Sequence, residues 1–204
     1  MIDMDAVSRE IEAGRAELAA SSKAILSLGT RRRIWEAILD PQDDEVSYRH
    51  RIELKMMCVR HVQGFWDRAF PGDSRVEEML TLARGLVGQQ VDARQAERQA
   101  ESFLVRVLDE VDDFNAVTEP ATFVADAASS MVVSACSHNP YYDIADDIVD
   151  DDELLPDSLE SSYSCASAAA NALNWVSIEA TDVPARRAFW TWYLDEAIPQ
   201  VLAG

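Results

Sequence analysis

The sequence predicts an all-α fold, a compact bundle-like domain of about seven or eight helices. Apolar residues recur at steps of three and four along most of the chain, as on one face of a helix. Strand-like alternation of useful length is absent from the sequence, and the seven glycines and seven prolines fall mainly at breaks. The 204 residues suit one domain, residues 1–204, in which residues 1–45 are expected to form a less tightly integrated N-terminal helical portion.

Three helices are expected in the first 70 residues. The first spans about residues 4–28 and is closed by Gly29, because glycine commonly ends helices. Thr30 is a candidate cap for a short helix, RRRIWEAIL. After the loop DPQDDEVS, a long helix is expected from about Tyr48 to Phe70, with an apolar stripe at every third or fourth position: Ile52, Met56, Val59, Val62 and Trp66.

Capping residues mark the helices that follow. Ser74 and Glu77 form an S-x-x-E capping box, and Asp92 caps a helix of about 92–113. Thr118-Glu119-Pro120 opens a helix that runs to about Ser137, since proline is tolerated in a first turn. After an acidic segment come a small-residue helix, SLESSYSCASAAANALNWV, and a last helix, VPARRAFWTWYLDEAIPQVL. The last is apolar nearly all round, which predicts a central position.

The net charge of −19 is concentrated in the second half of the chain. From Val107 to Ala185 there are 17 Asp and Glu residues and no Lys or Arg, whereas the first 106 residues are nearly balanced. Such a field repels nucleic acid and anionic membranes and accelerates encounter with a basic partner. The plainer interpretation is a bias for solubility, which explains a diffuse excess of acids better than a long cation-free stretch.

The most acidic part is DIADDIVDDDELLPD, residues 143–157, with eight carboxylates. Two tyrosines precede it, and tyrosine and tryptophan dominate interface hot spots. Most of the five tryptophans are expected in the core, with one or two available to anchor an interface. The candidate partner-binding residues are the acids and tyrosines of this stretch: Tyr141, Tyr142, Asp143, Asp146, Asp147, Asp150, Asp151, Asp152, Glu153 and Asp157.

An alternative interpretation of this stretch is a metal site. Residues 146–150 spell DDIVD, a DDxxD pattern of the kind that holds Mg²⁺ against a diphosphate in isoprenoid synthases. That chemistry also needs a second acidic cluster and cations for the diphosphate. The nearest acids are at 109–113, and no Lys or Arg follows before Arg186. A divalent-metal-dependent enzyme using these carboxylates is therefore the alternative function, and a weak cation site also stays open.

Other chemical signatures are missing from the sequence. No EF-hand loop, zinc motif, glycine-rich phosphate loop or nucleophile signature occurs. We therefore expect a protein that is not an enzyme, with no catalytic residue, no cofactor and no metal ligand. The run Arg31-Arg32-Arg33 is interpreted as a solvated helix start. Three separated cysteines and the lack of an export signal or transmembrane segment predict a cytoplasmic protein.

Two stretches resemble a known family. CVRHVQGFWDRAFPGDSRVEEML (58–80) has the pattern W-x-x-x-F-P-x-D-x-R-x-x-x-M-L, and ARRAFWTWYLDEAIPQVL (185–202) has R-x-F-W-x-W-Y-L-x-E-A-I-P. Between them, DDDELLPDSLESSYSCASA resembles an acidic D-E-L-x-P segment that ends in tyrosine. Together these stretches resemble the fifth numbered immunity protein family of bacterial polymorphic toxin systems, over roughly residues 50–204.

The resemblance implies a cytosolic antidote that binds the toxin domain encoded beside it and does no chemistry. It implies a cognate toxin domain as partner, and no catalytic residue carries over. The acidic field adds the expectation that this partner has a basic surface. The matched residues are interpreted as mostly structural: Trp66, Phe70, Pro71, Arg75, Phe189, Trp190, Trp192, Glu196 and Pro199. Arg75 beside Asp73, and Arg186 or Arg187 near the acids, are expected to form internal pairs. An acidic adaptor protein and a homodimer remain open.

Overall fold

The computed structural model describes residues 1–142, 144–145, 147–154 and 159–204. Within these residues the protein is all-α, as predicted, and strands are absent. The helices follow one another along the chain as α1 (Met4–Ala20), α2 (Leu28–Ala37), α3 (Asp44–Ala69), α4 (Arg75–Val87), α5 (Ala93–Glu110), α6 (Thr118–Cys136), α7 (Ser161–Ala170), α8 (Val183–Trp192) and α9 (Ile198–Ala203). A π-helical turn, Tyr193–Ala197, joins α8 and α9 into one continuous helix, so the described chain has eight helices.

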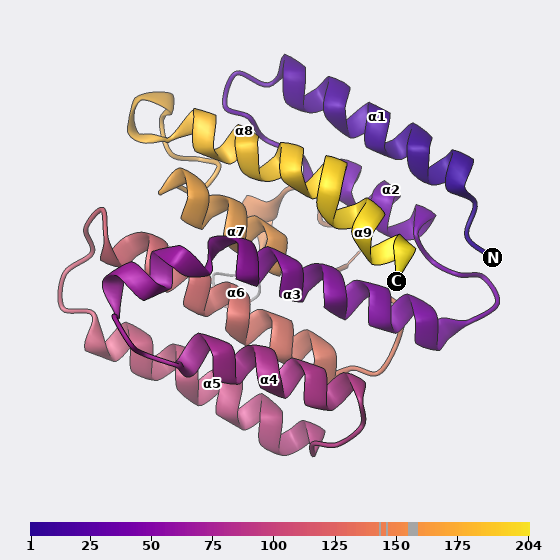
Figure 1. Ribbon diagram of the computed structural model, residues 1–204. Helices are drawn as coiled ribbons and strands as arrows, with labels where there is room; N and C mark the ends of the chain where they lie inside the picture. Colours follow the sequence, from indigo (N-terminus) through magenta and orange to yellow (C-terminus); the bar gives the residue numbers. More distant parts are fainter. Residues whose placement is uncertain (143, 146, 155–158) are drawn as a thin grey trace.

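The fold is built around α6, which packs against α3, α4, α5 and α7 (Figure 1). Most side chains of α6 are small and buried, among them Ala121, Ala125 and Ala128, so neighbouring helices approach closely. In Figure 1, α4 and α5 cover the lower side of this centre, while α1 and the continuous α8–α9 helix cover the upper side. The core of the molecule is therefore shared by helices from both halves of the sequence.

The last helix, which was expected to be central, is packed between other helices but is buried on one face only. The α8–α9 helix lies between α1 and α3 and contacts α7 (Figure 1). Phe189, Trp190 and Leu194 are buried, but Thr191 and Glu196 on another face are exposed. The helix therefore buries one aromatic and aliphatic face among its neighbours, while its opposite face meets solvent.

The first helix ends earlier than predicted, at Ala20, and α2 begins at Leu28 with Ser27 as its cap. The predicted terminator Gly29 and the predicted cap Thr30 both lie inside α2. Arg187 donates hydrogen bonds to the carbonyls of Leu18 and Ser21, at the C-terminal end of α1. These carbonyls lack helical partners, so a side chain from α8, 166 residues away for Ser21, supports the break.

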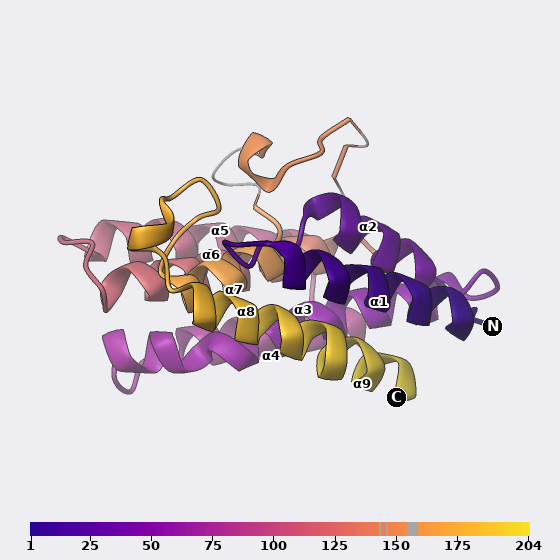
Figure 2. The same ribbon diagram turned by 90° about the horizontal axis from the view of Figure 1, so that it is seen from above.

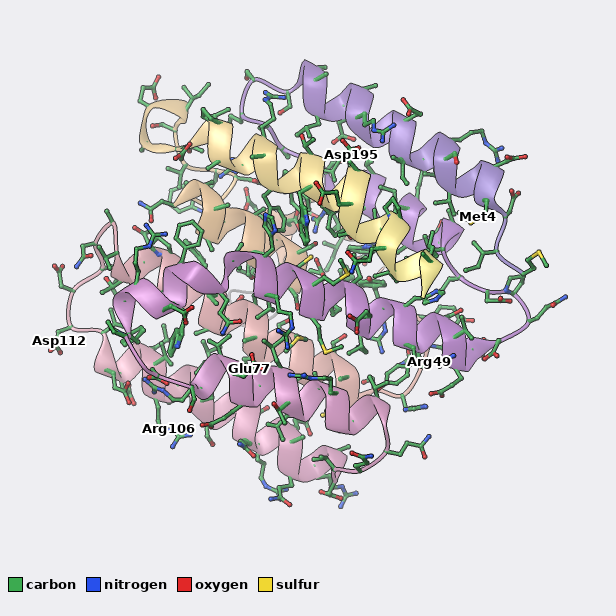
Figure 3. All side chains as sticks on the ribbon, viewed as in Figure 1. Met4, Arg49, Glu77, Arg106, Asp112 and Asp195 are labelled. Carbon is green, nitrogen blue, oxygen red and sulfur yellow. The ribbon has the colours of Figure 1, made fainter. Side chains whose placement is uncertain are left out.

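Helix α1 is tied to the C-terminal helix on its outer side as well. Arg15 of α1 pairs with Asp195 at 2.7 Å, and Figure 3 shows Asp195 on the α8–α9 helix beside α1. On its inner side, Val7, Ile11 and Leu18 belong to the same core cluster as the residues of α3 and α6. The first helix thus contributes to the main hydrophobic core.

The predicted starts of the later helices are partly right. Asp92 caps α5 by accepting a hydrogen bond from the Gln95 amide, and α6 begins at Thr118. The capping box at Ser74 is wrong: its hydroxyl donates to Glu78, and no side-chain cap bond forms. Asp73 takes over, because its carboxylate accepts a hydrogen bond from the Arg75 amide.

Candidate interaction surface

The acidic stretch projects from one side of the helical layer. We call residues 141–154 the acidic segment; all but residues 143 and 146 are described. In Figure 2 it stands above the helices on the side of α2, α6 and α7. Tyr141 and Val149 are 61% and 67% exposed, and four carboxylates are exposed with them: Asp147, Asp150, Asp152 and Glu153. Three of the predicted contact residues, Asp143, Asp146 and Asp157, lie outside the described residues.

Asp151, although predicted for the surface, is in the interior and only 1% exposed. Its carboxylate pairs with Arg31 of α2, which is fully buried. The same guanidinium lies 3.3 Å from Glu160, and Glu160 accepts a 2.7 Å hydrogen bond from Lys55 of α3. A buried charge must be paired, and here two acids face two cations. We call these four residues the buried ion cluster.

Aromatic rings and a serine complete the surroundings of this cluster. The guanidinium of Arg31 lies 5.5 Å from the ring of Trp35 and 5.2 Å from that of Trp190, within the range of cation–π attraction. Ser162 accepts a 3.1 Å hydrogen bond from Arg31, and its amide donates to Glu160. These groups compensate for much of the water that the buried charges lose, although the Nε of Arg31 has no hydrogen-bond partner among the described residues.

The two buried carboxyl groups respond to burial in opposite directions. Burial raises the pKa of Asp151, and the attraction of Arg31 offsets only part of that rise. Burial acts in the same sense on Glu160, but Lys55 and Arg31 together outweigh it, so the pKa of Glu160 is lowered. Glu160 is therefore the firmly ionised member that bridges both cations.

Two further arginines hold the backbone of this region. Arg32 donates to the carbonyls of Ala145 and Ile148, inside the acidic segment. Arg51 of α3 donates to the carbonyls of Ser137 and Asn139, just before it, at 2.8 and 2.9 Å. Carbonyl oxygens in a turn that makes few backbone bonds need such donors. The arginine run that we interpreted as a solvated helix start instead anchors the segment.

The two tyrosines of the segment have different roles. Tyr142 stacks on Trp35, with ring centroids 3.9 Å apart, and Lys55 lies 4.8 Å from its ring. Burial raises the pKa of Tyr142, so its hydroxyl stays neutral. Tyr142 therefore fixes the segment to the core, whereas the exposed Tyr141 is displayed to solvent.

Short-range bonds stiffen the tip of the segment. Residues Asp151–Glu153 form a 3-10 turn, and Asp150 caps it by accepting from the Asp152 amide at 3.1 Å. Glu153 accepts from the Val149 amide at 3.0 Å. The backbone that carries the exposed carboxylates is therefore held by hydrogen bonds within the segment and by its contacts with α2.

The sequence analysis missed two buried cations of α3: Lys55, which belongs to the buried ion cluster, and Arg51, which binds backbone carbonyls before the acidic segment. Arg51 and Lys55 lie one turn apart on the inward face of α3, next to the buried Ile52 and Met56. Two features of the sequence could have revealed these buried cations. They lie on a helical stripe that is otherwise apolar, and the second half of the chain has many acids without a neighbouring Lys or Arg. The predicted pair of Arg75 with Asp73 is confirmed at 2.7 Å. Arg186 departs from expectation, since it binds the carbonyls of Ala172 and Leu173.

The described residues contain no group of three or more His, Cys, Asp or Glu side chains that could hold a metal ion. Of the DDIVD motif, Asp146 lies outside this part of the chain, and Asp147 and Asp150 are exposed. Glu110, in the acidic cluster that a diphosphate site would need, pairs with Arg75. Within the described residues, no helix combines the length and hydropathy needed to cross a membrane.

These features define an all-helical protein in which buried contacts hold a segment that carries four exposed carboxylates. A family model described as "Immunity protein Imm5" matches residues 11–200, which is most of the chain. The chain belongs to this immunity protein family, as its sequence motifs indicate. Membership points to a toxin-neutralising immunity function. A comparison with curated proteins finds no match.

Proposed function

We propose that this immunity protein binds its cognate toxin domain through the exposed face of the acidic segment. The observation that carries the proposal is the sorting of carboxylates within the segment. Asp151 is neutralised inside, whereas Asp147, Asp150, Asp152 and Glu153 face outward. An outward set of like charges is unfavourable by itself, because the acids repel one another. A surface of this kind is best explained by a partner that supplies positive charge.

The anchoring of the segment supports the same function. Arg32, Tyr142 and the buried ion cluster hold it to α2 and α3. A surface that is ordered before binding loses less conformational entropy on association. The toxin face that binds it carries lysine and arginine side chains, as a nuclease channel or another anion-binding cleft does. Electrostatic steering then gives fast association, which an antidote requires.

The first experiment is rescue. Cells that express the toxin domain encoded beside this chain should survive when the chain is co-expressed. Death at the same rate with and without the chain, when both proteins are produced, would reject the proposed function.

The second experiment reverses one charge. Asp147→Lys should lower the association rate for the toxin domain by about three- to tenfold at low salt, with a weaker dependence on ionic strength. Asp67→Lys on α3 is the matched control, because Asp67 is also an exposed aspartate. Stopped-flow measurements at several salt concentrations compare the two variants. Equal rates for both would show that the toxin binds elsewhere.

A further inference from the structure

The loop between α7 and α8 exposes a tryptophan. Trp175 is 69% exposed, and Ile178 in the same loop is 41% exposed. The other four tryptophans differ, since Trp35, Trp66 and Trp190 are at most 3% exposed and Trp192 stacks on His61. Leaving an indole in water forfeits the stabilisation that its burial would give. Its exposure therefore calls for an explanation outside the core.

The loop is held in place by hydrogen bonds to its backbone. Lys23 donates to the carbonyls of Asn174 and Val176, at 3.1 and 2.8 Å, on either side of Trp175. Arg186 donates to the carbonyls of Ala172 and Leu173. These two cations fix the backbone that carries the indole, so Trp175 is presented in a defined position.

The loop is also coupled to the acidic segment. The hydroxyl of Tyr163 donates to Asp152 at 2.6 Å and accepts a 3.0 Å hydrogen bond from the Asn174 amide. Burial raises the pKa of Tyr163, which keeps the hydroxyl protonated for both bonds. In Figure 2 the α7–α8 loop and the segment rise from the same side of the molecule. Trp175 and the exposed carboxylates therefore belong to one surface.

The charge around Trp175 selects the kind of partner. Glu179 and Asp182 in the same loop are exposed, and the ammonium of Lys23 is engaged by two carbonyls. Residues 107–185 contain no Lys or Arg, so neither the α7–α8 loop nor the acidic segment carries a Lys or Arg of its own. Such surroundings repel lipid phosphates and nucleic acid, which removes two common reasons for an exposed indole. A basic protein surface is the complementary ligand.

We propose that Trp175, flanked by Ile178, is the aromatic anchor of the toxin-binding surface. It enters an apolar pocket of the toxin domain whose rim carries lysine or arginine. Those cations attract the acids of the segment and lie against the indole face in cation–π contact. This inference rests on the proposed function and adds the residue that sets the lifetime of the complex, because desolvated aromatic anchors slow dissociation.

The test separates association from dissociation by surface plasmon resonance on the immobilised toxin domain encoded beside this chain. Trp175→Ala should weaken binding by at least about 30-fold, almost entirely through faster dissociation. Trp175→Phe should recover part of the affinity. Met4→Ala is the matched control, because Met4 is 53% exposed at the start of α1, at the opposite end of the molecule from the α7–α8 loop (Figures 1 and 3). Thermal unfolding should be unchanged in all three variants, since neither side chain is in the core.

The binding measurements distinguish failure of the Trp175 anchor from failure of the proposed function. If Trp175→Ala dissociates like the wild type while Asp147→Lys associates slowly, the anchor is overturned and the proposed function stands. If the wild-type protein fails to bind the toxin domain, the proposed function fails. If Trp175 instead supports saturable binding to vesicles of phosphatidylcholine and phosphatidylserine, or to duplex DNA, the protein-anchor proposal is overturned. The proposal that Trp175 is the anchor is supported if Trp175→Ala, but not Met4→Ala, loses affinity through faster dissociation.

Discussion

Three adjacent arginines of α2 have different roles because their side chains point in different directions. Arg31, Arg32 and Arg33 follow one another on α2, and successive helical residues point about 100° apart. Arg31 therefore enters the core and pairs with Asp151, while Arg32 reaches the carbonyls of the acidic segment. Arg33 stays at the surface and pairs with Glu10 at 2.9 Å. One short run thus contributes a buried ion pair, a backbone anchor and a surface ion pair.

The difference predicts unequal losses of stability. Arg31→Met should lower the free energy of unfolding by about 3–5 kcal/mol, because Asp151 loses its cation and Glu160 loses one of two. Arg33→Met should lower it by at most about 1 kcal/mol, because exposed pairs contribute little. Urea unfolding followed by circular dichroism measures both. Equal losses in the two variants would contradict the assignment of the buried ion cluster.

At the scale of elements, the end of α2 and the start of α3 meet at a histidine. Burial lowers the pKa of His50 on α3, and the neighbouring Arg49 lowers it further. A hydrogen bond with the backbone of Ile38, at the end of α2, and the charge of Asp40 oppose this without cancelling it. The folded protein therefore prefers a neutral imidazole at this junction.

The lowered pKa fixes the sign of a pH effect. Below the ordinary histidine value of about 6.5, the unfolded chain binds a proton that the folded chain resists, so stability falls as the pH falls. His50→Gln should reduce the loss of stability between pH 7 and pH 5. Urea unfolding at each pH measures it, and the comparison at pH 8 controls for packing. An unchanged loss in the variant would show that other groups cause the pH dependence.

Element boundaries show where local sequence signals failed. The periodic stripes located the bodies of α3, α5 and α6, because those helices bury a full apolar face. The start of α3 was predicted four residues late, at Tyr48, because Asp43 caps the helix from within the expected loop. The end of α1 was missed because Arg187, far along the chain, binds its last carbonyls. The cap of α4 was missed because Asp73 displaces Ser74 from that role. At the end of α1 and at the start of α4, a side chain that the local pattern did not indicate bonds to the free backbone groups of the helix terminus.

At the scale of the whole molecule, the buried ion cluster and the arginine anchors leave most acids outside. The cations of the first half reach across the fold: Arg31 joins Asp151, 120 residues away, and Lys55 joins Glu160, 105 residues away. They neutralise two carboxylates and leave many others exposed. A net charge of −19 therefore acts mainly as repulsion across the surface.

This repulsion predicts stabilisation by salt. Raising NaCl from about 20 to 200 mM should increase the melting temperature by about 2–5 °C through screening. MgCl₂ at matched ionic strength should give a similar increase, because a carboxylate cluster with specific affinity is not expected. Differential scanning fluorimetry compares the salts. A clearly larger, saturable increase with millimolar MgCl₂ would reveal a divalent-cation site and favour the alternative metal-dependent function.

The sequence by itself determined the fold class, most helices, the family and the location of the excess negative charge. Helical periodicity and charge are local properties, so they can be counted along the chain. Only the tertiary structure decided that Asp151 and Tyr142 turn inward while Asp147, Tyr141 and Trp175 face outward. Those choices depend on pairings between residues more than 100 positions apart, such as Arg31 with Asp151, which no local pattern encodes.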